Sequence, residues 1–196
     1  SRDMLNQFSR CLYNRSNSAA LELLSKTDLG FVDFAQIGLE SDRAVRIYGF
    51  RDCLGRVASS HSSSVALRFT PASLRQWVLQ AAYLDRFPNG AEWVTPGNAV
   101  ATRQFPLSAN DRTVRVVMDF ADCVVATSPY DADWFYRTVE GTAGANEALN
   151  DLMPALGPCL AAGQTAELTP AALRLWLGEA LWHAALNNAP AAPATE

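Results

Sequence analysis

Hydrophobic residues recur every three to four positions over most of this 196-residue chain, which is the spacing of amphipathic α-helices. The pattern is clear where each half of the chain begins. The apolar faces of these opening helices are Leu5, Phe8, Cys11 and Leu12 in the first half, and Val117, Phe120, Cys123 and Val124 in the second. The cysteines share the apolar faces and are expected to point inward. We therefore predict an all-α fold.

A Thr-Pro pair is expected to begin the closing helix of each half. Thr70 and Thr169 are good N-caps, and Pro71 and Pro170 then occupy the first helical position, where a missing N–H costs no hydrogen bond. The residues that follow each pair keep the helical apolar spacing. Each half should therefore end in an amphipathic helix.

Three short blocks occur twice in the same order, which predicts an internal repeat. An aromatic residue precedes a cysteine by three positions at Phe8 and at Phe120, and a Cys-Leu pair follows in each half. Residues 69–77 and 168–176 then share Thr-Pro-Ala, Leu-Arg and Trp at matching places. The offset between the copies shrinks from block to block, so the extra residues fall in loops between helices.

The repeat predicts a tandem duplication of a roughly four-helix unit. The first unit covers residues 1–85 and the second covers residues 111–186. A connector at 86–110 is rich in turn residues yet partly apolar, which favours an ordered strap. The tail at 187–196 has nothing to bury and is expected to be disordered. The inner helices are expected at about 18–25 and 42–54, then at about 131–139 and 145–156, with Pro154 delaying, kinking or breaking the last one.

The four cysteines form no CxxC pair, and no His stands at metal-ligand spacing from them, which favours two disulfides. Of the three possible connectivities, only Cys11 with Cys53 and Cys123 with Cys159 puts the same bridge in both copies. Four buried free thiols in a cytosolic protein are the alternative. Disulfides form in oxidising compartments, so we expect a periplasmic or secreted protein whose natural N-terminus, with any signal peptide, lies upstream of residue 1.

Composition and charge narrow the class of partner. The chain is 49% hydrophobic, enough for a packed core, and its net charge of -4 with scattered arginines argues against a nucleic-acid partner. No apolar run approaches the roughly 20 residues that a membrane-spanning helix needs. We therefore predict no membrane span in this chain.

Two short phrases carry a resemblance to known proteins. Residues 119–125, Asp-Phe-Ala-Asp-Cys-Val-Val, and residues 157–161, Gly-Pro-Cys-Leu-Ala, are followed by the capped Leu-Arg helix. Together they resemble uncharacterised exported bacterial proteins of alphaproteobacteria, sphingomonads in particular. The resemblance implies a location in the cell envelope and brings no activity, cofactor or ligand with it.

Few residues suggest chemistry. His61 lies in a Ser-rich stretch whose flexibility would not hold a catalytic triad, and His183 stands four residues after Glu179 on one helix face. Sequence motifs for phosphate loops, zinc proteases, serine hydrolases and calcium loops are absent. We therefore expect no cofactor and no metal site, and we favour a protein without catalytic activity.

The remaining candidates are aromatic and basic residues. Trp134, Phe135 and Tyr136 are consecutive, so a helix cannot point all three one way, and we take this cluster as a possible partner surface. Arg75 and Arg174 occupy equivalent positions in the two closing helices, which suggests a repeated structural salt bridge.

The function that fits these patterns is an exported helical binding or structural protein of the cell envelope, with a protein or small-molecule partner. One alternative is an enzyme with an unrecognised site at Glu179 and His183. Another is a small-molecule carrier with a pocket between helices.

Overall fold

The computed structural model describes residues 2–29, 31–36, 38, 40–61, 70–102, 107, 110–161 and 168–189. In this part of the chain the regular elements are α-helices, and the only β pairing is the single bridge between Asp28 and Phe31. The predicted all-α class is therefore confirmed. The Ser-rich loop, the His61 side chain and most of the C-terminal tail lie outside the described residues.

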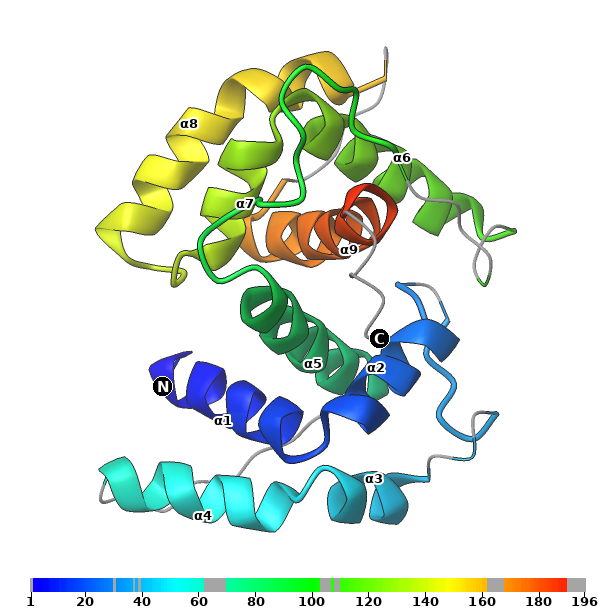
Figure 1. Cartoon of the computed structure of the whole chain (residues 1–196), viewed down its shortest axis with the longest axis vertical. Helices are drawn as coiled ribbons and strands as arrows, with labels where there is room; N and C mark the ends of the chain where they lie inside the picture. The colour runs from blue at the N-terminus through cyan, green and yellow to red at the C-terminus, as the bar shows by residue number, and fades with distance from the viewer. Residues whose placement is uncertain are drawn as a thin grey trace, which may run out of the picture. The chain divides into compact units, whose positions relative to one another are not determined.

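The chain divides into two compact units, Ser1–Arg86 and Phe87–Glu196 (Figure 1). Unit 1 contains α1 (Arg2–Arg15), α2 (Asn17–Lys26), α3 (Ser41–Ile47), α4 (Phe50–His61) and α5 (Pro71–Arg86). Unit 2 contains α6 (Arg112–Thr127), α7 (Pro129–Arg137), α8 (Ala143–Cys159) and α9 (Pro170–Asn188). Each unit is described by itself below.

The opening helix organises unit 1. Helix α1 packs against α2, α4 and α5, and α5 also packs against α2. Phe8 and Leu12 of α1 are buried, as is Leu74 of α5. The Phe8 and Trp77 rings meet edge to face, with centroids 5.9 Å apart and planes at 80°. These contacts account for the apolar stripes of the two helices.

Unit 2 is built in the same way around α6. This helix packs against α7, α8 and α9, and α7 packs against both α8 and α9. Phe120 of α6 is buried and meets Trp176 of α9 edge to face, with centroids 6.3 Å apart and planes at 87°. Asp111 and Thr169 cap α6 and α9 through side-chain acceptors, and Pro170 is the first residue of α9, as the Thr-Pro pattern predicted.

The two units differ in the element that carries the second cysteine. The prediction of one helix at 42–54 was wrong, because the chain turns at Gly49 and forms α3 and α4 instead. Gly49 has φ of +62°, and a Cβ there would lie 2.1 Å from Nε of Arg15. In unit 2 the corresponding element is the single helix α8, which continues through Pro154.

The segment after Arg86 lies on unit 2. Phe87, Ala91 and Trp93 are buried, and the Asn188 side chain bonds both the N–H and the carbonyl of Ala101, at 3.0 and 3.1 Å. Ala101 is thus held at the end of α9, which continues to Asn188 and so includes the first two residues of the predicted tail. Residues 87–102 form no helix of their own.

Helices α7 and α9 approach each other closely at a glycine. A Cβ at Gly178 of α9 would lie 2.5 to 2.7 Å from the ring and hydroxyl of Tyr136 on α7. Tyr136 is itself buried, so its ring has little room to withdraw. Glycine at this position therefore sets how closely the two helices pack.

We expect Gly178→Ala to lower the free energy of unfolding by about 1 to 3 kcal/mol, because the added methyl overpacks the contact with Tyr136. Gly55→Ala is the matched control, since a Cβ at Gly55 in α4 meets nothing within 4 Å. The control should gain about 0.5 to 1 kcal/mol from helix propensity. Urea unfolding of both variants checks this, and equal stability of the two would contradict the packing argument.

Candidate functional site

The four cysteines form two disulfides, one in each unit. Cys11 of α1 is bonded to Cys53 of α4, and Cys123 of α6 is bonded to Cys159 of α8, with Cα atoms 5.7 and 5.6 Å apart. The predicted pairing is confirmed, and no cysteine is free. The paired cysteines are 42 and 36 positions apart in the sequence, so loop closure in the unfolded chain would give each bond about 4 kcal/mol of stabilisation.

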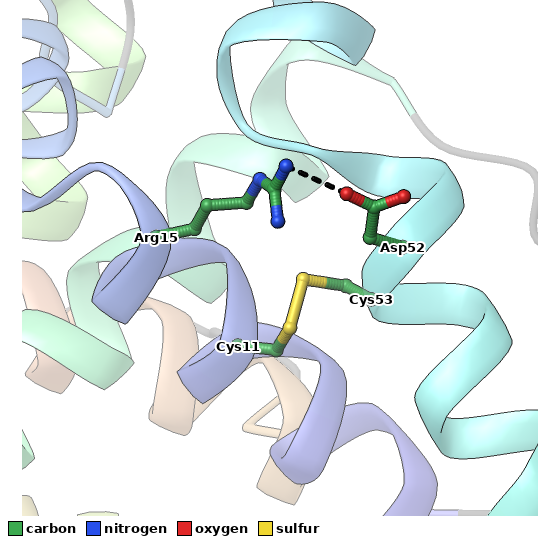
Figure 2. Close-up of a disulfide and its surroundings, with 4 residues drawn as sticks. All are labelled: Cys11, Arg15, Asp52 and Cys53. Carbon is green, nitrogen blue, oxygen red and sulfur yellow. Dashed lines mark ion pairs between the residues drawn. A yellow bond between two sulfur atoms is a disulfide. The ribbon is translucent and has the colours of Figure 1, made fainter.

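An ion pair joins the same two helices beside the first disulfide. Figure 2 shows Arg15 reaching from α1 toward Asp52 on α4, and their nearest atoms are 2.6 Å apart. Both side chains are about half exposed, so solvent limits the pair to roughly 1 kcal/mol or less. The pair therefore orients the Arg15 guanidinium toward α4 and adds little to the stability of the unit.

The equivalent arginines of α5 and α9 both bind the end of the second helix of their unit. Arg75 is buried and donates from Nε to Oγ1 of Thr27, at 2.8 Å, and from Nη2 to the Thr27 carbonyl, at 3.2 Å. Thr27 is the C-cap residue of α2. The guanidinium thus satisfies a carbonyl that the helix itself leaves without a partner.

Arg174 repeats this arrangement in unit 2. It donates to the carbonyl of Thr138, at 2.7 Å, and to Oγ1 of the same residue, at 2.9 Å. Thr138 is the C-cap of α7. Arg174 also donates to the Phe135 carbonyl, at 2.7 Å, and its guanidinium carbon lies 4.4 Å from the centre of the Phe135 ring.

The sequence identified these arginines as equivalent but did not identify the acceptors described above, which are backbone carbonyls and threonine hydroxyls. The repeated salt bridge stays a prediction. A sequence signal did exist: a basic residue followed by threonine, Lys26-Thr27 and Arg137-Thr138, ends the second helix of each unit. Backbone acceptors have no side-chain signature, so this signal identifies only half of the interaction.

An ion pair between side chains four residues apart on the helix precedes each of these threonines. Lys26 lies 2.5 Å from Glu22, and Arg137 lies 2.5 Å from Asp133. The first pair is exposed, and the hydrogen bond from Lys26 lowers the pKa of Glu22. The second pair is largely buried.

Only one of the three residues of the predicted aromatic surface is exposed on α7. Trp134 is 48% exposed, while Phe135 and Tyr136 are 1% and 3% exposed. Consecutive residues of a helix point about 100° apart, so Phe135 and Tyr136 face inward when Trp134 faces outward. The Phe135 ring packs under Arg174, and the Tyr136 ring lies against Gly178. Tyr130, one turn before Trp134 and 56% exposed, completes the aromatic face that α7 leaves uncovered.

Glu179 and His183 meet on α9. His183 Nε2 lies 3.1 Å from Oε1 of Glu179, and Glu179 is only 1% exposed. The Thr-Pro register places Gln80 and Leu84 at the same positions of α5, so this pair belongs to unit 2 alone. A buried carboxylate can orient an imidazole by a hydrogen bond, and such pairs occur in acid–base catalysis.

Metal and membrane sites receive no structural support. Among the residues that the structure describes, no group of three or more His, Cys, Asp or Glu side chains could hold a metal ion. None of the described helices is both long enough and apolar enough to cross a bilayer. Neither feature therefore supplies a functional assignment.

The two arginines give the clearest test of the repeated contacts. We expect Arg75→Met and Arg174→Met each to lower the free energy of unfolding by about 2 to 4 kcal/mol, because buried carbonyls lose a charged donor. Arg112→Met, at an exposed position of α6, should change it by less than about 0.5 kcal/mol. Chemical unfolding followed by circular dichroism measures the stability of all three variants. An Arg75→Met or Arg174→Met protein as stable as the Arg112→Met control would refute the structural role.

Comparisons with known proteins add no identity to these observations. No protein-family model matches the chain, and searches of curated proteins and of solved structures give no match. The function therefore has to be argued from the disulfides, the arginine contacts and the exposed surfaces.

Proposed function

We propose that the protein is an exported binding or structural protein of the bacterial cell envelope. The observation that carries this proposal is that all four cysteines are consumed in disulfides, one pair in each unit. The cytosol keeps such thiols reduced, whereas the periplasm and the extracellular space allow the bonds to persist. A stabilised scaffold of this kind suits a protein that works outside the cytoplasm.

We also propose that the two units arose by duplication of one helical module. Four contacts in unit 1 have a counterpart in unit 2: the disulfide, the edge-to-face Phe-Trp pair, the arginine on a C-cap threonine, and the ion pair before that threonine. These contacts involve different residue types and different helices. Independent origin of all four in the same chain order would require four coincidences.

Binding fits the molecule better than catalysis because its repeated contacts are structural. The arginine, aromatic and disulfide contacts hold helices in place. The side chains exposed around these contacts differ between the two units. In unit 2 the face formed by Tyr130 and Trp134 offers large apolar side chains to a partner.

The compartment can be tested in the cells that make the protein. We expect it in the envelope or medium fraction, with all four cysteines resistant to a thiol-alkylating reagent until a reductant is added. A cytosolic protein with few disulfides is the control for premature oxidation during fractionation. Recovery from the cytoplasmic fraction with four alkylated thiols would overturn the proposed location.

An enzyme remains the second candidate, and the 3.1 Å contact between His183 and Glu179 is the observation that favours it. In this case His183 would act as a general acid or base oriented by the buried carboxylate. If a turnover is found, His183→Ala should reduce kcat by about 100-fold or more. Full activity of that variant would remove the assignment, and Leu84→Ala at the equivalent position of unit 1 is its control.

A further inference from the structure

Charge is divided unequally between the two units. Unit 1 contains 11 Lys and Arg against 8 Asp and Glu, a net charge of +3, whereas unit 2 contains 5 against 12, a net charge of -7. The overall charge of -4 conceals this difference. A ligand attracted by positive charge would therefore be expected on unit 1.

Two depressions lie on unit 1 near the first disulfide. One has a volume of about 410 Å³, and its polar lining residues are Gln7, Asn14, Arg15, Arg56 and Ser60. No acidic residue lines it in the part of the chain that the structure describes. The volume lies within the range of about 300 to 1,000 Å³ that is typical of small-molecule sites.

The other depression shares Arg15 with the first. Its volume is about 490 Å³, and it is lined by Arg46 and Arg51 but also by Asp42 and Asp52. Its two carboxylates offset much of the positive charge. An anion is therefore favoured in the acid-free depression that contains Arg56.

Two contacts locate the Arg15 side chain in the structure. Its side chain lies over Gly49, where any Cβ would collide with it, and its guanidinium is held by Asp52. Figure 2 shows this ion pair beside the disulfide. The Arg15 guanidinium thus lies at one wall of the acid-free depression while a solvent-exposed ion pair holds it toward Asp52.

Arg56 supplies the available charge. It is exposed on α4, and no ion pair or hydrogen bond engages its guanidinium within the described residues. A guanidinium presents a planar fork of N–H donors that matches the two oxygens of a carboxylate or phosphate. Gln7 and Asn14 can add neutral amide donors from α1.

We propose that the depression containing Arg56 and Arg15 binds the oxyanion of a small acidic molecule. Arg56 would hold the anion, Arg15 would contribute through the guanidinium surface not used by Asp52, and Val57 with the Cys11 side of the disulfide would contact an apolar part of the ligand. This site deepens the binding function proposed above and rests on it.

The test is a titration of the oxidised full-length chain with inorganic phosphate and, separately, with citrate at low ionic strength. Calorimetry or amide chemical shifts should show saturable binding of one or both anions that weakens as salt is added. Binding of phosphate alone, of citrate alone or of both supports the site and identifies the acid group it takes.

Charge variants locate the binding. Arg56→Gln should raise Kd about tenfold, as expected for loss of one charge-assisted hydrogen-bonding group. Arg10→Gln is the matched control, because this substitution removes the same charge from a residue that is exposed on α1 and lines neither depression. It should change Kd by less than about twofold.

Three results would overturn the proposal: no saturable binding of either anion, equal weakening by Arg10→Gln and Arg56→Gln, or a larger effect of Arg51→Gln than of Arg56→Gln. The titration is independent of the compartment experiment. An envelope protein that binds neither anion loses only this site, and a cytoplasmic protein that binds one loses only the proposed export.

Discussion

The covalent bond between the opening helix and the helix that carries the second cysteine is the constraint on which each unit depends. Helix α1 contacts α2, α4 and α5, and α6 contacts α7, α8 and α9, so the opening helix is the common neighbour in both units. Fixing it to one partner covalently leaves the edge-to-face Phe-Trp contact to position the closing helix. The buried arginine of the closing helix then holds the end of the second helix.

The units keep this framework and differ in what they place around it. Beside its disulfide, unit 1 has Arg15 paired with Asp52, while in unit 2 Thr127 lies 4.0 Å from Cys159. The closing helix of unit 2 carries a buried glutamate and a histidine, where unit 1 has an amide and a leucine. The two units also carry opposite net charges, +3 for unit 1 and -7 for unit 2. If the proposed duplication is correct, its two copies have diverged in surface, so that one unit could bind an anion and the other an apolar partner.

The elements that follow local chemistry could be predicted from the sequence. Apolar spacing indicated the helices, the Thr-Pro pairs fixed the starts of α5 and α9, and matching cysteines identified both disulfides. What could not be predicted depends on neighbours distant in the chain. The break at Gly49 depends on a positive φ at that residue. Arg75 and Arg174 bind backbone acceptors, and the acid-free depression gathers residues that are dispersed along the sequence.

The most direct measurement is a non-reducing tryptic peptide map of the protein isolated from the cells that make it. Cys11 lies in the peptide 11–15 and Cys53 in 52–56, while Cys123 and Cys159 lie in 116–137 and 138–174. The account predicts one species joining 11–15 to 52–56 and another joining 116–137 to 138–174, with no alkylated cysteine. A peptide of the first unit linked to one of the second, or four alkylated thiols, would contradict it.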